Sequence, residues 1–552
     1  MTPSPFWPAG LPWTLDRPKR SVFANLQASA TRTPERVAIV FYGLELSYAG
    51  LLSRVETLAA FLQHGCGVRA GDRVLLDMQN SPQFIVAYYA ILRADAVVVP
   101  VNPMNLTEEL RYFAEDSGAS VALIGSELQE RFTPLLGEPL QHVIVARYAD
   151  ELSGDRPFRV PPVVAESEGV ATIDGFIAWG EAMAESGKPS AERTGADDLC
   201  VMPYTSGTTG KPKACMHTHD AVNHTAFAQA VWYGYDQPET VLTAFMPLFH
   251  VAGMQASLNG GIASGVTMVV MARWDRDLIP LLFERYGVTF WSAAPTMIVD
   301  VLASPDFTDR AFRKLRVLTG GGASMPAAVA NELLTRFGLR FCEGYGLSET
   351  ISATHINPVD RPKPQCLGIP IFETVSRIID PETLAELPAG EIGEIIVAGP
   401  QIMRGYWKRP DADKEVFIER DGLRFLRTGD LGYVDEEGYY FIVDRLKRMV
   451  SVSGFKVWPA ECEAILYRHP AVQECCVIAA PDAYRGETVK AYIVKRPGAD
   501  PAFDGKALMA WARTVMAPYK APRLVEFVEA LPRSGSSKID WRRLQEAEWA
   551  KT

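Results

Sequence analysis

Short apolar runs separated by amphipathic stretches organise most of the chain, and their spacing predicts its fold. Residues 37–41 and 44–48 flank a Tyr-Gly pair, which is typical of a β-hairpin. Further on, residues 74–76 and 97–101 are apolar runs of strand length, and residues 82–93 between them have a helical pattern. Strands that alternate with helices of about ten residues are typical of βαβ units on a parallel sheet. We therefore predict an α/β fold built from parallel α/β subdomains.

The pattern changes towards the end of the chain. From about residue 367 the apolar runs shorten, as at residues 393–397, and this predicts a small β-rich subdomain. Past residue 444, helix-like residues 459–469 and strand-like residues 474–479 predict a compact α+β segment. A large N-terminal domain followed by a small C-terminal domain is therefore expected.

Composition and charge limit the function. The 552 residues are too many for a single core, so several domains or subdomains are expected. The formal net charge of −11 argues against a general nucleic-acid binder and against a polybasic membrane anchor. No apolar run reaches the length of a membrane span, and residues 1–20 lack the apolar core of a signal peptide.

The cysteines indicate the compartment. All eight are spread thinly along the chain, and none forms a Cys-x-x-Cys pair. Buried free thiols in a reducing compartment are the simplest interpretation of this pattern. We therefore expect a cytoplasmic protein.

Residues 204–213 form the most unusual polar stretch, in which six small hydroxyl or glycine residues run directly into two lysines. Glycine lets backbone N–H groups approach an anion, hydroxyl groups add donors, and lysine adds positive charge. The stretch is not a Walker motif, because only two residues separate its glycines and a proline follows Lys211. We predict a phosphate-binding loop, with a plain surface loop as the alternative. Its residues are Thr205, Ser206, Gly207, Thr208, Thr209, Gly210, Lys211 and Lys213.

Three further stretches carry candidate polar residues. His250 lies in an apolar run, where a histidine satisfied within the core is the alternative to a functional one. Tyr345 offers an aromatic face for a base close to Glu349, whose carboxylate would suit Mg²⁺ beside a phosphate loop, with a polar turn and a surface glutamate as the alternative. Asp430 ends a β-like segment and could accept bonds from a ribose diol, although an aspartate in a turn is the simpler interpretation.

Taken together, five stretches resemble the core motifs of the adenylate-forming (AMP-binding) superfamily, which includes acyl-CoA synthetases, peptide-synthetase adenylation domains and beetle luciferases. The matching stretches are Thr205–Lys213, Gly344–Thr350, Thr428–Asp430, Asp444–Lys447 and Leu531–Ile539. The resemblance covers nearly the whole chain. It implies that a carboxylate attacks the α-phosphorus of Mg-ATP to give an acyl-adenylate and pyrophosphate. A thiol then attacks the acyl carbon and releases AMP.

The resemblance also implies roles for individual residues. The phosphate loop would hold the β- and γ-phosphates, and other residues would frame the adenine: Gly320, Gly321, Gly322, Ala323, Glu343, Gly344 and Tyr345. Ser348 and Glu349 would contact the α-phosphate and Mg²⁺, and Asp430 and Arg445 would hold the ribose. Lys538 would contact both the carboxylate and the α-phosphate. Gly454 would lie beside the pantetheine of CoA.

A mobile lid is a further implication of the resemblance. It divides the chain into an N-terminal AMP-binding domain at residues 1–443, a hinge at residues 444–447 and a C-terminal lid domain at residues 448–552. Lys447 would be the pivot of the hinge. Two departures from the family pattern are Ser348, where threonine is usual, and Ser537, where glycine is usual before the final lysine.

The acyl substrate is less well defined. Residues 245–253 lack the aspartate with which amino-acid adenylation domains usually pair the substrate ammonium, so an amino acid is not expected. Small residues at 260–265 could leave room for an apolar chain, and the local sequence style most resembles fatty acyl-CoA synthetases. We therefore expect a medium- or long-chain fatty acid, with CoA as acceptor.

Three alternatives stay open. The substrate could be an aryl acid, because a pocket lined by small residues also fits a flat ring. The acceptor could be a carrier protein instead of CoA. The chain could also be a non-catalytic protein with a metal site at His217, His219 and His224, although residues two apart do not share a helix face. The sequence does not determine the oligomeric state, and a homodimer is compatible with it.

Overall fold

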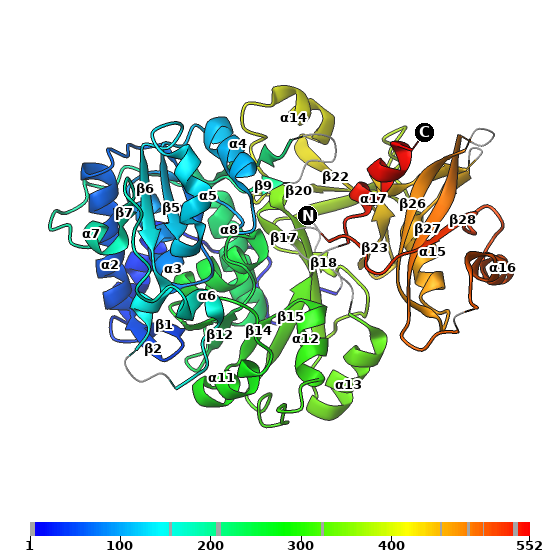
Figure 1. Cartoon of the computed structure of the whole chain (residues 1–552), viewed down its shortest axis with the longest axis horizontal. Coiled ribbons are helices and arrows are strands. Elements are labelled where there is room, and N and C mark those ends of the chain that lie inside the picture. Colours follow the sequence, from blue (N-terminus) through cyan, green and yellow to red (C-terminus); the bar gives the residue numbers. More distant parts are fainter. Residues whose placement is uncertain are drawn as a thin grey trace. The chain divides into compact units, whose positions relative to one another are not determined.

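The computed structural model describes residues 6–153, 157–205, 211–321, 325–452, 455–482, 486–500, 502–533 and 539–551 (Figure 1). The chain folds into two compact units. Unit 1 comprises Met1–Ser376, Val397–Leu426 and Glu437–Tyr439, and unit 2 comprises Arg377–Ile396, Arg427–Glu436 and Tyr440–Thr552. This division into units does not test the hinge at residues 444–447, which stays a prediction.

A nine-stranded sheet forms one half of unit 1, in the order β18-β17-β16-β15-β14-β12-β13-β1-β2. The strands from β16 to β1 in this order run parallel, and the pairs at both edges are antiparallel. Their bounds are β1 (Val37–Phe41), β2 (Leu44–Ser47), β12 (Val241–Ala244), β13 (Thr267–Val270), β14 (Phe290–Ser292), β15 (Val317–Gly321), β16 (Phe341–Leu347), β17 (Ser352–Ile356) and β18 (Ile369–Pro370).

A seven-stranded sheet, ordered β11-β8-β4-β3-β5-β6-β7, forms the other half of unit 1. Parallel pairing from β8 to β7 confirms the predicted βαβ units. The bounds are β3 (Arg73–Asp77), β4 (Val97–Pro100), β5 (Val121–Gly125), β6 (His142–Ala146), β7 (Ile177–Ala178), β8 (Leu199–Val201) and β11 (His217–Thr218). Apolar side chains of β3, β4, β5 and β6 are almost fully buried, as continuous apolar runs predict for a parallel sheet covered on both faces.

Several helices of unit 1, α3 among them, begin at a residue whose side chain caps the first turn. Helix α3 occupies the predicted residues Pro82–Arg93: the Ser81 side chain accepts a hydrogen bond from Phe84 N, and proline holds the first turn. The others are α1 (Phe23–Arg32), α2 (Tyr48–His64), α4 (Thr107–Ser117), α5 (Gln129–Phe132), α6 (Pro162–Ala165), α7 (Trp179–Ala182), α8 (His219–Tyr233), α9 (Val251–Gly253), a π-helix (Met254–Asn259), α10 (Gly260–Ser264), α11 (Leu278–Tyr286), α12 (Pro295–Leu302), α13 (Ala327–Phe337) and α14 (Pro410–Val416).

The predicted β-rich subdomain is a third sheet, in which β20 and β22 are central. Its strands are β19 (Val375–Ile379), β20 (Gly393–Ala398), β21 (Phe417–Arg420), β22 (Leu423–Val434) and β23 (Tyr440–Arg445). The boundary between the two units crosses some of these strands. Their pairing is antiparallel between β21 and β22 and between β22 and β23.

The rest of unit 2 has the expected α+β character. A long antiparallel pair, β26 (Val472–Asp482) and β27 (Gly486–Lys495), is the centre of its own sheet. Around it lie β24 (Val450–Val452), β25 (Phe455–Val457), β28 (Leu524–Phe527), α15 (Pro459–Leu466), α16 (Gly505–Val515) and α17 (Trp541–Trp549). An apolar cluster that includes Cys462, Val477 and Leu508 forms the core between this sheet and its helices.

Candidate active site

Two parallel strands bring the predicted adenine-framing residues together at their carboxyl ends. In the register of β15 and β16, Gly320 lies opposite Glu343, and Gly321 lies opposite Gly344. A Cβ atom at Gly321 would lie 2.4 Å from the carbonyl oxygen of Gly344, so only glycine allows this close approach. Carboxyl ends of parallel strands are the usual place for ligands in open α/β sheets.

Glu343 is buried at this edge and has an altered acidity. Its Oε1 accepts hydrogen bonds from Met325 N at 3.1 Å and from Gln365 N at 3.3 Å. Burial raises the pKa of Glu343 to about 7, although the two backbone N–H groups oppose the shift. Near neutral pH a large fraction of this carboxyl group is therefore protonated. Tyr345, two residues on, lies beside the ring of His355 with 5.7 Å between the ring centroids.

The turn that carries Ser348 and Glu349 is held by polar contacts on either side. It is a 3₁₀ turn at Ser348–Thr350, in which Thr350 Oγ1 accepts a hydrogen bond from Leu347 N at 2.8 Å. His217 Nε2 lies 2.7 Å from the carbonyl oxygen of Ser348. Burial lowers the pKa of His217 to about 4, so the ring is neutral at physiological pH and donates its Nε2–H to this oxygen.

A stretch that the sequence analysis passed over lies against Glu349. Tyr406 is buried, and its hydroxyl group donates a hydrogen bond of 2.9 Å to Glu349 Oε1. The backbone of Glu349 is fixed by the same stretch, because Met403 N donates to its carbonyl oxygen at 2.9 Å. The sequence signal that could have identified Tyr406 as a candidate is its position directly after Gly405.

The ends of the predicted phosphate loop are fixed by a short β-ladder. Strand β9 (Tyr204–Thr205) pairs with β10 (Lys213–Ala214), and Thr205 lies opposite Lys213. Both lysines lie over tyrosine rings: Lys211 Nζ is 5.1 Å from the Tyr112 centroid, and Lys213 Nζ is 4.9 Å from the Tyr406 centroid. A cation over an aromatic face is attracted to it and keeps its charge.

In unit 2, the two predicted ribose residues lie opposite one another on β22 and β23. Arg445 Nε is 2.9 Å from Asp430 Oδ1, and the Asp430 side chain is almost fully buried. Asp430 N donates to Thr428 Oγ1, which in turn donates to the carbonyl oxygen of Ile395 at 2.7 Å. The predicted Thr-Gly-Asp motif thus lies within strand β22 and is held by local hydrogen bonds, so the expectation that Asp430 ends its β segment is wrong.

The predicted pivot lies in the turn that follows β23. Lys447 is exposed within a 3₁₀ turn at Leu446–Arg448. On one side the Asp444 carboxylate accepts hydrogen bonds of 2.7 Å from Arg445 N and from Ala460 N. On the other side Arg448 pairs with Glu463. Lys447 therefore lies between two anchored neighbours.

Several predicted residues cannot be placed. Ser206, Gly207, Thr208, Thr209, Gly210, Gly322, Ala323, Gly454 and Lys538 lie outside the described residues.

The segment around His250 is positioned by Asn80. Asn80 Nδ2 donates to the carbonyl oxygens of Ala244 and Met246 at 3.0 and 2.9 Å, and its Oδ1 accepts from Leu248 N at 2.8 Å. His250 itself is exposed and caps the next helical turn, where its Nδ1 accepts from Ala252 N at 3.2 Å. The alternative of a core histidine is therefore wrong.

The glycines after this segment do not leave empty space. A Cβ atom at Gly261 would lie 3.0 Å from Met268 Sδ and 3.2 Å from Leu242 Cδ1, because α10 packs directly on β12 and β13. A Cβ atom at Gly260 would lie 3.0 Å from the carbonyl oxygen of Gln255. The expectation that these two glycines make room for an acyl chain is wrong, because their positions are filled by the core.

The three clustered histidines do not form a metal site. His219 Nδ1 accepts from Val22 N at 3.0 Å, and His224 Nε2 lies 3.0 Å from the carbonyl oxygen of Phe372. Together with the bond from His217, these contacts give each ring a separate structural role. Within the described part of the chain, no group of three His, Cys, Asp or Glu residues is arranged to hold a metal ion.

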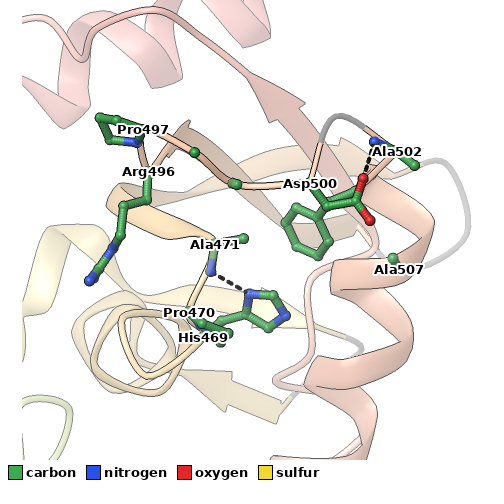
Figure 2. A pocket seen from close by; sticks show the side chains of 11 residues that line it. His469, Pro470, Ala471, Arg496, Pro497, Asp500, Ala502 and Ala507 are labelled. Carbon is green, nitrogen blue, oxygen red and sulfur yellow. Dashed lines mark hydrogen bonds between the residues drawn. The ribbon is translucent and has the colours of Figure 1, made fainter.

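A cavity of about 540 Å³ lies in unit 2 and contains none of the predicted site residues (Figure 2). His469 lines it, and its Nδ1 accepts from Ala471 N at 3.2 Å while its ring stacks on Phe503 with centroids 4.6 Å apart. Asp500 accepts a hydrogen bond from Ala502 N at 2.8 Å. These contacts hold the walls of the cavity in place.

Comparison with known families gives two matches. The AMP-binding enzyme family matches residues 26–407, and the AMP-binding enzyme C-terminal domain matches residues 461–538. The chain belongs to the AMP-binding enzyme family. This membership confirms the resemblance stated from the motifs, the α/β fold class and the prediction of an AMP-forming acid–thiol ligase.

Individual relatives of this AMP-binding enzyme differ in substrate. It is 34% identical over 551 residues to a long-chain-fatty-acid–CoA ligase of Bacillus subtilis (strain 168), covering 98% of this chain and 97% of the relative. It is 36% identical over 514 residues to a feruloyl-CoA synthase of an Amycolatopsis species, covering 92% and 95%. The crystal structure of ATP-bound MatB from Rhodopseudomonas palustris superposes with a TM-score of 0.81 and 29% identity, covering 96% of this chain and 99% of that one.

None of the helices in the described ranges is both long enough and apolar enough to cross a membrane.

Proposed function

We propose that this AMP-binding enzyme is an acyl-CoA synthetase that activates a medium- or long-chain fatty acid with ATP and transfers the acyl group to CoA. The observation that carries the proposal is the arrangement on Tyr406, whose hydroxyl group bonds Glu349 and whose ring lies under Lys213. A carboxylate for a metal ion and a cation for phosphate thus lie beside the exit of the phosphate loop.

The first step would join the two anionic substrates. A carboxylate oxygen of the acid attacks the α-phosphorus of ATP, the bond from this phosphorus to the bridging oxygen breaks, and pyrophosphate leaves. Lys213 and Lys211 would neutralise the phosphates, and Lys538 would contact both the carboxylate and the α-phosphate. Positioning and charge stabilisation of this kind can account for most of the rate gain in phosphate chemistry.

The second step would transfer the acyl group. The thiol of CoA loses its proton to solvent as its sulfur attacks the acyl carbon, the bond from this carbon to the adenylate oxygen breaks, and AMP leaves with that oxygen. Lys447 would be the pivot about which the C-terminal lid turns between the steps, and Gly454 and His250 would lie beside the incoming thiol. Gating by a few residues that absorb a φ/ψ change is a common device.

The residues present fit a magnesium ion. Glu349 Oε1 accepts the bond from Tyr406, and for Oε2 the described residues supply no partner, so one oxygen is available to a cation. Mg²⁺ is usually held by one or two carboxylates together with substrate phosphates. When bound, the ion would neutralise charge on the phosphate oxygens.

Support for a fatty acid comes from the full-length likeness to the Bacillus ligase and from the apolar residues that precede His250. The feruloyl-CoA synthase, with a slightly higher identity over a shorter stretch, favours an aryl acid as the second candidate. A reducing cytoplasm suits the eight cysteines, all of which are buried and free.

A panel of acids tests the substrate. AMP release would be measured with decanoate, hexadecanoate, ferulate and benzoate, each with and without CoA, and compared by kcat/KM. We expect a fatty acid to exceed both aryl acids by at least about tenfold and turnover to require CoA. A preference for ferulate would establish the second candidate. Accumulation of acyl-AMP without CoA-dependent turnover would indicate a carrier-protein acceptor. The Glu349→Gln enzyme is the matched control for contaminating activity.

A further inference from the structure

Tyr406 contacts two groups of opposite charge through different parts of one side chain. Its hydroxyl group donates to Glu349 Oε1 at 2.9 Å, and its ring centroid lies 4.9 Å from Lys213 Nζ. The side chain is only 6% exposed, so both contacts are largely shielded from water. Tyr406 thus holds Lys213 on its ring face and Glu349 at its hydroxyl end, so the two charged groups contact different parts of one side chain.

Lys213 and Glu349 do not pair directly. No carboxylate of the described residues lies within 4.0 Å of Lys213 Nζ, although salt bridges at that distance occur in many other places in unit 1. A direct ion pair would compensate both charges. It would leave less of the lysine charge for phosphate and less of the carboxylate for a metal ion.

The phenol interacts with each partner without neutralising it. An aromatic face attracts an ammonium group but carries no net charge, and a hydroxyl donor orients a carboxylate while leaving it ionised. Neither contact therefore removes a charge that the bound nucleotide would need. An aliphatic side chain such as leucine, which has neither an aromatic face nor a hydroxyl donor, could do neither.

The backbone of Tyr406 is fixed relative to both partners. Its N–H donates to Asp413 Oδ1 at 2.8 Å, and its neighbours on each side pair with the strand that leaves the phosphate loop. Trp407 N donates to the carbonyl oxygen of Ala214 at 2.9 Å, and Met216 N donates to that of Gly405 at 3.0 Å. Tyr406, Lys213 and Glu349 are therefore held by one set of backbone hydrogen bonds.

We propose that Tyr406 is a positioning residue that orients Glu349 and keeps Lys213 from pairing with it, so that both charges remain available to Mg-ATP. The inference rests on the proposed function, because it takes Glu349 as the residue that holds the metal ion. It adds a role for a residue outside the motifs on which the family resemblance rests.

A double-mutant cycle on nucleotide binding tests this role. ATP affinity would be measured by titration calorimetry with Mg²⁺, without acid or CoA, so that no reaction occurs. Tyr406→Leu would be introduced into the wild-type, Lys213→Met and Glu349→Gln backgrounds, and thermal unfolding would verify that each variant is folded. We expect Tyr406→Leu to weaken binding about tenfold in the wild type and by less than about threefold in the other two backgrounds, because no ion pair can form there.

The same loss in all three backgrounds would overturn the proposal, since a merely structural role would be additive. Should Tyr406→Leu fail to fold, Tyr406→Phe keeps the ring and removes only the hydroxyl group. It should weaken ATP binding at limiting Mg²⁺ but not at saturating Mg²⁺, and equal binding to wild type at both concentrations would also overturn the proposal. If ATP binding by Glu349→Gln depended on Mg²⁺ as strongly as in the wild type, Glu349 would not hold the metal ion. The premise of the inference would then fail separately.

Discussion

Arg445 Nε lies 2.9 Å from Asp430 Oδ1, and the two residues face one another across the strands β22 and β23. Asp430 is almost fully buried, whereas the Arg445 side chain is 47% exposed. The arginine thus pairs with a buried carboxylate while most of its own side chain surface is less enclosed. We propose that these two residues hold the hydroxyl groups of a ribose.

Loss of the Asp430 charge should weaken ATP binding through the ribose. Asp430→Asn should raise the KM for ATP by about tenfold, because a charged acceptor bonds a hydroxyl group more strongly than a neutral one. The matched control is 2′,3′-dideoxy-ATP, for which wild type and variant should differ little. An equal loss with both nucleotides would contradict a ribose contact.

Glu343 should make the stability of the protein depend on pH. Its pKa is raised from about 4.5 to about 7, so between these values the folded state retains a proton that the unfolded state has lost. The contribution of Glu343 to the free energy of unfolding is therefore fully present below about pH 4.5, declines as pH rises, and is gone above about pH 7.

Glu343→Gln should remove this dependence. Relative to the variant, the wild type should lose up to roughly 3 kcal/mol of unfolding free energy between pH 4.5 and pH 7, and no more above it. Urea unfolding of both proteins in the absence of nucleotide measures the difference. A difference that does not change with pH would show that Glu343 titrates normally.

Lys538 should be needed for the first half-reaction only. Lys538→Ala should reduce acid-dependent exchange of pyrophosphate into ATP by at least about a hundredfold, because a positive charge between two anions is lost. A supplied acyl-adenylate should still be converted to the thioester at a near-normal rate. Near-normal exchange in this variant would refute the assigned role, and Lys551→Ala is a control for the loss of a lysine near the C-terminus.

Lys447 should matter for the second half-reaction only. Proline at this position restricts φ and should hinder the turn of the lid, while the anchored neighbours Asp444 and Arg448 keep the local fold. Lys447→Pro should therefore preserve pyrophosphate exchange and slow thioester formation by about tenfold or more. Lys447→Ala, which leaves the backbone unrestricted, should affect neither step strongly. An equal loss of both half-reactions in the proline variant would contradict a hinge.

Local patterns predicted much of the fold. Residues 82–93 form the expected helix, because Ser81 and Pro82 start it and the apolar positions continue through it. Residues 37–48 form the expected hairpin, in which Tyr42 and Gly43 both have positive φ. Local patterns did not predict the order of the strands in the sheet. For example, β12 lies between β13 and β14, and the composition of these strands does not indicate which strands pair with one another.

The candidate site was predictable where its residues are close in sequence. Glu343, Gly344, Tyr345 and Glu349 were identified as one group because they share a single stretch, and β16 with the turn after it carries all four. Tyr406 was missed because its partner Glu349 is 57 residues away. The glycines at 260 and 261 were misinterpreted, since a sequence does not show whether the space beside a glycine is empty or filled by another element.

The fate of one oxygen atom tests the central claim most directly. With hexadecanoate labelled with ¹⁸O in its carboxylate, wild-type enzyme, Mg-ATP and CoA, mass spectrometry of the released AMP measures oxygen transfer. Attack of the carboxylate on the α-phosphorus, followed by attack of the thiol on the acyl carbon, predicts one ¹⁸O atom in each AMP. AMP without the label, or release of ADP instead of AMP, would contradict the account.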